Sequence, residues 1–190
     1  MTTSPPVRFG YVDESIHDSA GLYVVALVSA VPSLADQVRG VLAACVPAVR
    51  RPHWHGEDEA TKYALVRAVA TLPIEAKVYG CRFAVRGRQE AARARALGWA
   101  VTDLGRGVRH LVVDRRQEQQ NLKDRRVLSG LAGRPARYTF THCSSESEPM
   151  LWLPDIVVGA AASHLTGREE LHLKALGRIV RGVMCEQVTL

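Results

Sequence analysis

The alternation of apolar and polar residues near the N-terminus predicts two antiparallel strands. Residues 8–14 (RFGYVDE) alternate along one strand, and residues 21–30 (GLYVVALVSA) are rich in β-branched side chains. The short connection holds small and polar residues such as Ser15, Asp18 and Gly21. We therefore expect a β-hairpin at the start of the chain.

Helical and strand patterns alternate along the rest of the chain. After Ser33, which with Asp36 resembles a capping box, apolar residues recur at helical spacing until Pro47. Further helices are predicted over 57–72, 87–104, 121–131, 150–165 and 169–180, and further strands over 74–85, 108–114 and 137–143.

This order of elements is typical of an α/β domain. A hairpin followed by alternating helices and strands predicts a mixed β-sheet with helices on its faces. The chain has 190 residues, no linker and no repeat, so we predict a single domain over residues 1–190.

Composition excludes several other classes of protein. Hydrophobic residues make up 47% of the chain, which argues against disorder. The longest uncharged stretch, residues 19–35, is too short and too broken by Pro and Ser to span a bilayer, so no membrane partner is expected. The first residues have no apolar core behind a basic start, so we expect no secretory signal, and the four cysteines lie far apart. These features favour a cytoplasmic setting.

Positive charge is concentrated in the middle of the sequence. Residues 77–137 hold 15 Lys and Arg against 5 Asp and Glu, whereas the whole chain has a net charge of +6. Most of these cations are Arg, whose planar guanidinium suits phosphate. Nucleic acid is therefore the expected partner, although a solvated helical face would give the same composition. The residues predicted to contact phosphates are Arg82, Arg86, Arg88, Arg115, Arg116, Lys123, Arg125 and Arg126.

Four carboxylates are candidates for chemistry. Asp13 and Asp114 each lie where an apolar strand is expected to end, which is where α/β folds gather reactive groups. Glu57 lies at an expected helix start, where an acid would also simply complement the helix dipole. Asp155 is the single charge in an apolar helix, which is costly unless something compensates it.

The surroundings of Asp155 suggest space for a ligand. On a helix it shares a face with Gly159 and Ala162, and these small residues would leave room above the carboxylate. Carboxylates from separate elements are the ligands that Mg²⁺ prefers. Two such ions about 3.5–4 Å apart can activate water and stabilise the leaving oxygen of a phosphodiester.

These segments also resemble a known family. YVDES (11–15), GLYVVALV (21–28), HWHGED (53–58), LVVD (111–114) and LWLPDIVVGAA (151–161) follow one another in this order. Together they resemble the uncharacterised family catalogued as domain of unknown function 3800, which looks like an RNase H-like fold. The resemblance covers most of the chain, through short motifs.

The resemblance implies a set of metal ligands. Asp13, Glu57, Asp114 and Asp155 match the four acids that, in RNase H-like enzymes, bind two Mg²⁺ or Mn²⁺ ions and hydrolyse a phosphodiester. Asp58 and Glu59 remain alternatives to Glu57. We therefore predict a metal-dependent nuclease acting on DNA or RNA. A non-catalytic nucleic-acid-binding module and a hydrolase of small phosphate esters are the alternatives.

Other residues permit further interpretations. His53 or His55 could donate a proton to the leaving oxygen, and His55 is taken as the catalytic candidate. His53 and His55 could instead bind Zn²⁺ with His142 and Cys143. Trp54 is either a stacking platform for a base or a core residue. No nucleophile elbow or phosphate-binding glycine loop occurs in the sequence. Exposed strand edges would favour a homodimer.

Overall fold

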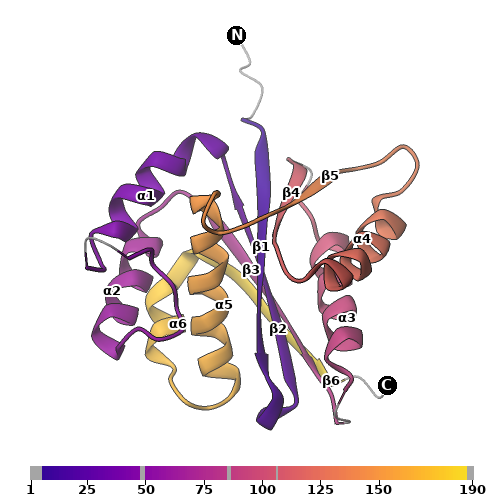
Figure 1. The fold of residues 1–190 in the computed structure, drawn as a ribbon. Coiled ribbons are helices and arrows are strands. Elements are labelled where there is room, and N and C mark those ends of the chain that lie inside the picture. The colour runs from indigo at the N-terminus through magenta and orange to yellow at the C-terminus, as the bar shows by residue number, and fades with distance from the viewer. Residues whose placement is uncertain (1–5, 48–49, 85–86, 106, 188–190) are drawn as a thin grey trace.

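The computed structural model describes residues 6–47, 50–84, 87–105 and 107–187, and within these ranges six strands form one sheet (Figure 1). The strands are β1 (Arg8–His17), β2 (Leu22–Ala30), β3 (Glu75–Arg82), β4 (Val108–Asp114), β5 (Thr139–Cys143) and β6 (Val180–Gln187). Their order across the sheet is β5-β4-β1-β2-β3-β6.

The sheet is mixed. β1 and β2 form the N-terminal antiparallel hairpin, and β3 pairs antiparallel with β2. The other three pairings, β4 with β1, β5 with β4 and β6 with β3, are parallel. The predicted α/β fold with an N-terminal hairpin is thus confirmed, and the arrangement is consistent with an RNase H-like fold.

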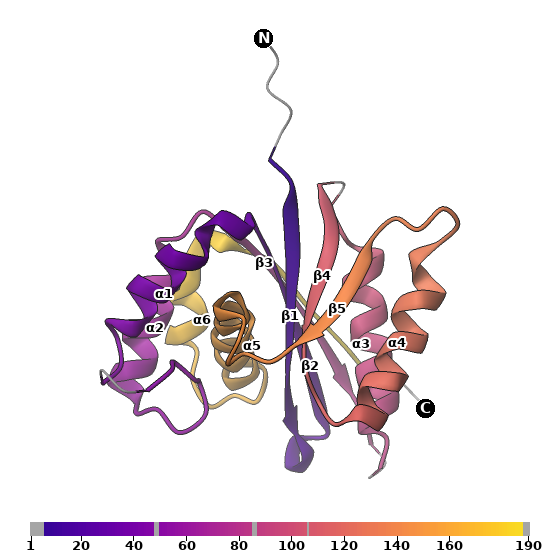
Figure 2. The ribbon, with the colours of Figure 1, turned by 45° about the horizontal axis from the view of Figure 1, so that its top comes forward.

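Helices cover both faces of the sheet (Figure 2). One face carries α1 (Ala35–Ala43), α2 (Glu59–Ala70), α5 (Trp152–Leu165) and α6 (Leu171–Leu176), and we call it the α5 face. The opposite face carries α3 (Gln89–Thr102) and α4 (Glu118–Ala132), and we call it the α3–α4 face. No helix in the described ranges has the length and apolar character needed to cross a lipid bilayer.

The central strand β2 contributes to both cores. Val24 and Ala26 are buried on the α5 face, and Tyr23 and Val25 are buried on the α3–α4 face. Successive side chains of a strand point to opposite faces, so a strand covered on both sides reads as a continuous apolar run. The sheet therefore separates two hydrophobic layers.

The C-terminal region differs from its predicted structure. Residues 169–180 were expected to form one helix, but α6 ends at Leu176 and a 3₁₀ turn (Gly177–Ile179) leads into β6. Gly177 has a φ of 57°, which a helix interior does not allow. The outer edge of β3 then offers hydrogen bonds to a segment that contains β-branched Val180 and Val183.

The predicted capping box is also wrong. Ser33 lies inside a 3₁₀ turn (Pro32–Leu34), and its side chain does not cap α1. Pro32 starts this turn, because its fixed φ suits a first helical position. Asp36 instead forms an ion pair of 2.7 Å with Arg39 on the surface of α1.

Candidate active site

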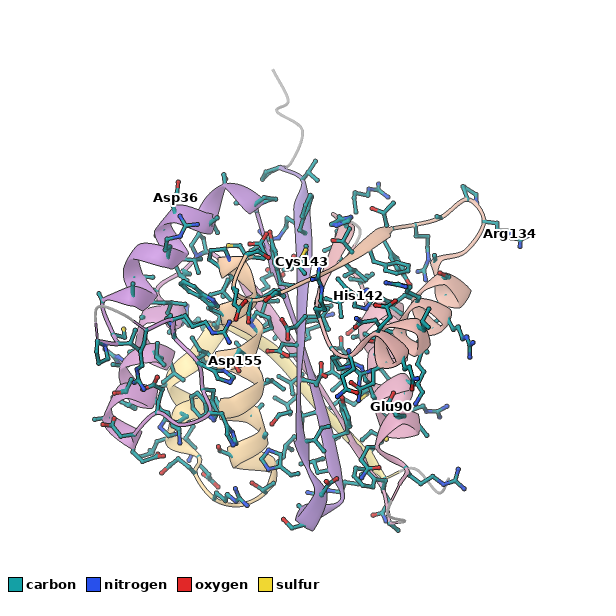
Figure 3. The ribbon with its side chains drawn as sticks, in the orientation of Figure 1. Asp36, Glu90, Arg134, His142, Cys143 and Asp155 are labelled. Carbon is teal, nitrogen blue, oxygen red and sulfur yellow. The ribbon has the colours of Figure 1, made fainter. Side chains whose placement is uncertain are left out.

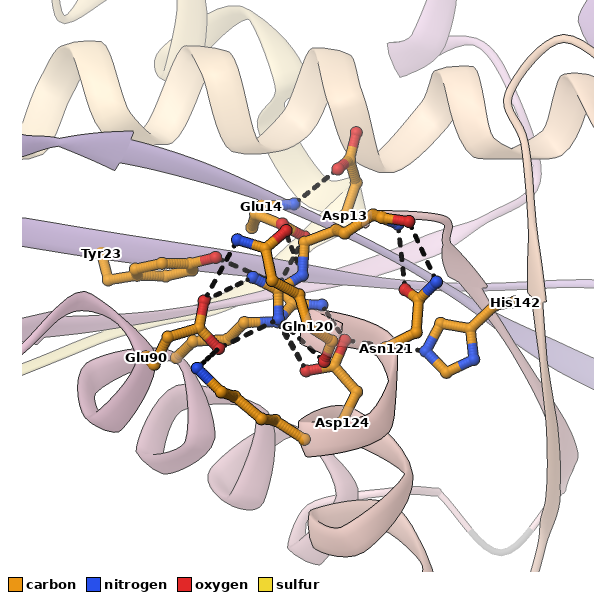
Figure 4. A network of polar contacts seen from close by, with 11 residues as sticks. Asp13, Glu14, Tyr23, Glu90, Gln120, Asn121, Asp124 and His142 are labelled. Atoms are coloured by element: carbon orange, nitrogen blue, oxygen red, sulfur yellow. Dashed lines mark hydrogen bonds and ion pairs between the residues drawn. The ribbon is translucent and has the colours of Figure 1, made fainter. Parts of the chain in front are cut away.

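Asp13 lies in the interior of β1 and faces α5. Tyr11 belongs to the core of the α5 face, and the alternation of the strand places Asp13 on the same side. Figure 4 shows the carboxylate pointing toward that side. The prediction that the strand ends near Asp13 is wrong, because β1 continues to His17, which pairs with Leu22 of β2.

Asp114 ends β4 beside Asp13. Val12 and Val113 are register partners on these two parallel strands, and the two aspartates are the next residues along each strand. Val112 belongs to the core of the α5 face, so Asp114 also points to that face. Two carboxylates therefore lie on neighbouring strands and on one side of the sheet.

The third carboxylate comes from α5, which covers this face (Figure 3). Asp155 Oδ2 accepts a hydrogen bond of 2.8 Å from the backbone N–H of Trp54 and one of 2.9 Å from His53 Nδ1. The Asp155 side chain is 14% exposed. These bonds compensate the acid in its apolar helix and tie the segment around Trp54 to α5.

Trp54 packs on Gly159, one of the small residues expected to leave space beside Asp155. A Cβ atom built at Gly159 would lie 2.1 Å from Trp54 Cγ, so the indole packs directly on the glycine. Trp54 is 8% exposed, and its ring meets His172 edge-on at 5.2 Å. Trp54 is therefore a core residue, and Gly159 also forms part of the wall of two cavities.

The three aspartates act on one another electrostatically. Burial raises the pKa of Asp13 well above its ordinary value. The negative charge of Glu14 raises this pKa next, followed by the charges of Asp155 and Asp114. Burial and the charge of Glu14 likewise raise the pKa of Asp114. The α5 face thus holds a concentration of negative charge that favours proton or cation binding.

Glu57 is placed differently from the aspartates. Its Oε2 atom pairs with Arg50 at 2.6 Å, and it is not among the main charges that raise the pKa of Asp13. Asp58 is the N-cap of α2 and accepts a hydrogen bond of 2.7 Å from the Thr61 backbone N–H. Glu59 forms an ion pair with a lysine of α2. The fourth ligand therefore stays a prediction.

Two neighbouring cavities, which we together call the groove, lie beside Asp155 and share Ser15, Trp54, His55 and Gly159 in their linings. The smaller cavity, of about 390 Å³, is lined in part by His53, His55 and Asp155. The larger, of about 640 Å³, is lined in part by His55 and Glu57. Both cavities share Trp54 as part of their walls. His55 is exposed and lines both cavities.

The donor set fits a hard divalent cation. The aspartates supply oxygen ligands of the kind that Mg²⁺ and Mn²⁺ prefer. Among the residues that the structure describes, however, no three His, Cys, Asp or Glu side chains form a ready-made metal site. The alternative zinc site does not form, because His142 and Cys143 point to opposite faces of β5. His142 lies beside Asp124, and Cys143 packs against the core of the α5 face (Figure 3).

A buried ion-pair network supports β1 from the opposite face (Figure 4). Arg93 is 1% exposed, donates to both oxygens of Asp124 at 2.8 and 2.7 Å, and pairs with Glu14. Because Glu14 directly follows Asp13, this network fixes the backbone that carries the first aspartate.

Most of the predicted phosphate-binding residues lie away from the aspartates. Arg116 belongs to the same network, is 9% exposed, and pairs with Glu90 at 2.8 Å and Asp124 at 3.0 Å. Its guanidinium is therefore not an exposed phosphate ligand as expected. Arg82 is half-buried and donates to the carbonyl oxygen of Leu165. Arg86 lies outside the described residues, and the exposed remainder are Arg88, Arg115, Lys123, Arg125 and Arg126.

The exposed cations of α4 lie on the opposite side of the sheet from the aspartates. Lys123 and Arg126 belong to the α3–α4 face, and the sheet stands between them and Asp13. Cations that do line the groove, Lys62 and Arg168, come from α2 and from the segment after α5. They are scattered singly in the sequence, so no local excess of charge marks them.

A scan against protein-family models and a search of the curated proteins find no match to this sequence. The assignment of a function therefore depends on the geometry of the site.

Proposed function

We propose that this protein is a divalent-metal-dependent nuclease. The observation that carries the proposal is the convergence of Asp13, Asp114 and Asp155 from β1, β4 and α5 on one side of the sheet. Among the described residues, these three carboxylates have one ion-pair partner, His53, which contacts Asp155. Such a concentration of like charge in a mostly buried position is costly, and divalent cations would offset it.

Each residue has a role in this proposal. Asp13 and Asp114 would hold the cations from the sheet, and Asp155 would hold them from α5, with Glu57 as a further ligand. Bound Mg²⁺ or Mn²⁺ would activate a water molecule and stabilise the leaving oxygen of a phosphodiester. His55 would give a proton to that oxygen from the groove. His53 would keep Asp155 oriented.

A cleavage assay tests the proposal. Labelled DNA and RNA oligonucleotides are incubated with the protein in Mn²⁺ or in EDTA, and the products are separated by size. We expect Mn²⁺-dependent cleavage, which Asp114→Asn lowers by at least about 100-fold. Asp36→Asn, which changes an exposed aspartate of α1, should cleave as the wild type does. Full activity of Asp114→Asn, or cleavage in EDTA, would contradict the proposal.

One observation favours a second candidate, a non-catalytic module that binds nucleic acid. Asp155 is already engaged by His53 and by the Trp54 backbone, and Glu57 is paired with Arg50. A protein of this kind would bind oligonucleotides without cutting them, and EDTA would not change its melting temperature. Release of phosphate from mononucleotides without cutting of polymers would instead favour a small phosphate-ester hydrolase.

Three further expectations remain predictions. The resemblance to the domain of unknown function 3800 agrees with the fold, and the cytoplasmic setting rests on the sequence. A homodimer would use β5 or β6, the edges of the sheet.

A further inference from the structure

The larger cavity of the groove is lined in part by basic side chains from separate parts of the chain. His17 comes from the end of β1, His55 from the loop before α2, Lys62 from α2 and Arg168 from the segment after α5. The smaller cavity shares Trp54 and His55 with the larger one and also has Asp155 in its lining. Basic side chains therefore lie close to the proposed metal site.

Acidic residues also line the groove, but each has a partner. Glu57 pairs with Arg50, and Glu59 pairs with Lys62 at 2.9 Å. Glu169 accepts a hydrogen bond of 2.7 Å from the backbone N–H of a residue in α6. Ion pairs thus offset the charges of Glu57 and Glu59, with Lys62 itself as the partner of Glu59, whereas Glu169 has only this hydrogen bond.

One cation of the groove lacks such compensation. Arg168 is exposed, and the described residues offer its guanidinium no carboxylate within ion-pair distance. Burial lowers the pKa of His17, so this side chain offers a phosphate a hydrogen bond more than a positive charge. The guanidinium of Arg168 is therefore the main attraction for an anion in the groove.

We propose that the groove lined by His17, His55, Lys62 and Arg168 binds phosphates of the substrate strand next to the bond that is cut. The inference rests on the proposed function and gives it a substrate path. The strand would leave the aspartates along the α5 face and would not run over the cation-rich α3–α4 face. A phosphate chain placed at Asp13 could reach Lys123 or Arg126 only by passing around the sheet.

Strand binding can be measured without cutting. In an Asp13→Asn background, the anisotropy of a labelled single-stranded oligonucleotide gives the Kd at several salt concentrations. Arg168→Gln should reduce the slope of log Kd against log salt by about 0.7, because one phosphate contact is lost. This change corresponds to about a threefold smaller loss of affinity between 50 and 200 mM salt.

Two matched arginine variants complete the experiment. Arg126→Gln tests the rival path on α4. Arg178→Gln is a control, because Arg178 precedes β6 near the start of β3, away from the groove. We expect wild-type slopes for both. The proposal is overturned if Arg126→Gln changes the slope and Arg168→Gln does not, or if the protein binds no oligonucleotide.

Cleavage by the otherwise wild-type Arg168→Gln protein separates this inference from the proposed function. Mn²⁺-dependent cleavage with an unchanged KM would overturn the groove assignment and leave the nuclease intact. Groove-dependent binding by a protein that never cuts would support the groove as a strand-binding site and overturn the nuclease.

Discussion

Replacing Asp13 by Asn should stabilise the metal-free protein. The Asp13 carboxylate is mostly buried, and the charges of Glu14, Asp155 and Asp114 raise its pKa. Asn has nearly the same shape, and its oxygen can still accept the hydrogen bond of 2.7 Å from the backbone N–H of Glu14. The substitution therefore removes a disfavoured charge and little else.

The expected gain is about 1–3 kcal/mol at neutral pH, the usual cost of a poorly compensated buried polar group. For a chain of this length that gain raises the Tm by about 2–12 °C. Because the folded pKa of Asp13 lies above its ordinary 3.8, wild-type stability falls as pH rises from 3.8 through the folded value. The advantage of Asn should accordingly vanish below pH 3.8.

Thermal melts with and without Mn²⁺ provide the assay. At 100 times its Kd, a ligand adds about 2.7 kcal/mol to the wild type, and Asp13→Asn should gain much less. Asp36→Asn, the exposed control, should behave as the wild type in both conditions. The reasoning is refuted if Asp13→Asn melts well below the wild type in EDTA, or if Mn²⁺ stabilises both proteins equally.

The remaining predictions concern the residues that support the site. Gly159→Ala would force a Cβ into the ring of Trp54 and should cost about 1–3 kcal/mol in urea unfolding; no loss would contradict the packing described. Asp124→Asn removes one carboxylate partner of the buried Arg93 and should lower the free energy of unfolding by about 3–5 kcal/mol in the same urea experiment. An unchanged free energy of unfolding would show that the network is dispensable. His53→Gln should lower the free energy of unfolding most below pH 6.5, and the loss should shrink as pH rises through the raised pKa of His53. A loss of stability that does not change with pH would count against the ion pair between His53 and Asp155.

Local patterns were sufficient to predict most of the fold. The hairpin followed from the alternation around Asp13 and the β-branched run of β2, and β4 was predicted with its observed bounds, Val108–Asp114. β6 could not be found in this way, because its strand conformation depends on the free edge of β3 and its own residues are mostly exposed. Pairing partners distant in sequence leave no local signal.

The site was predicted in part, for similar reasons. The convergence of Asp13, Asp114 and Asp155 follows once the strand order is known. Their partners do not, because the contact between Trp54 and Gly159 joins segments about 100 residues apart. The charge excess over 77–137 includes the cations of α3 and α4 but not Lys62 and Arg168, which line the groove.

The most direct test of the central claim is a crystal structure of the protein soaked in millimolar Mn²⁺, with anomalous scattering used to locate the ions. The account predicts an anomalous peak that is coordinated by Asp13 and by Asp114 or Asp155. Peaks confined to other carboxylates, with none among these three aspartates, would contradict it.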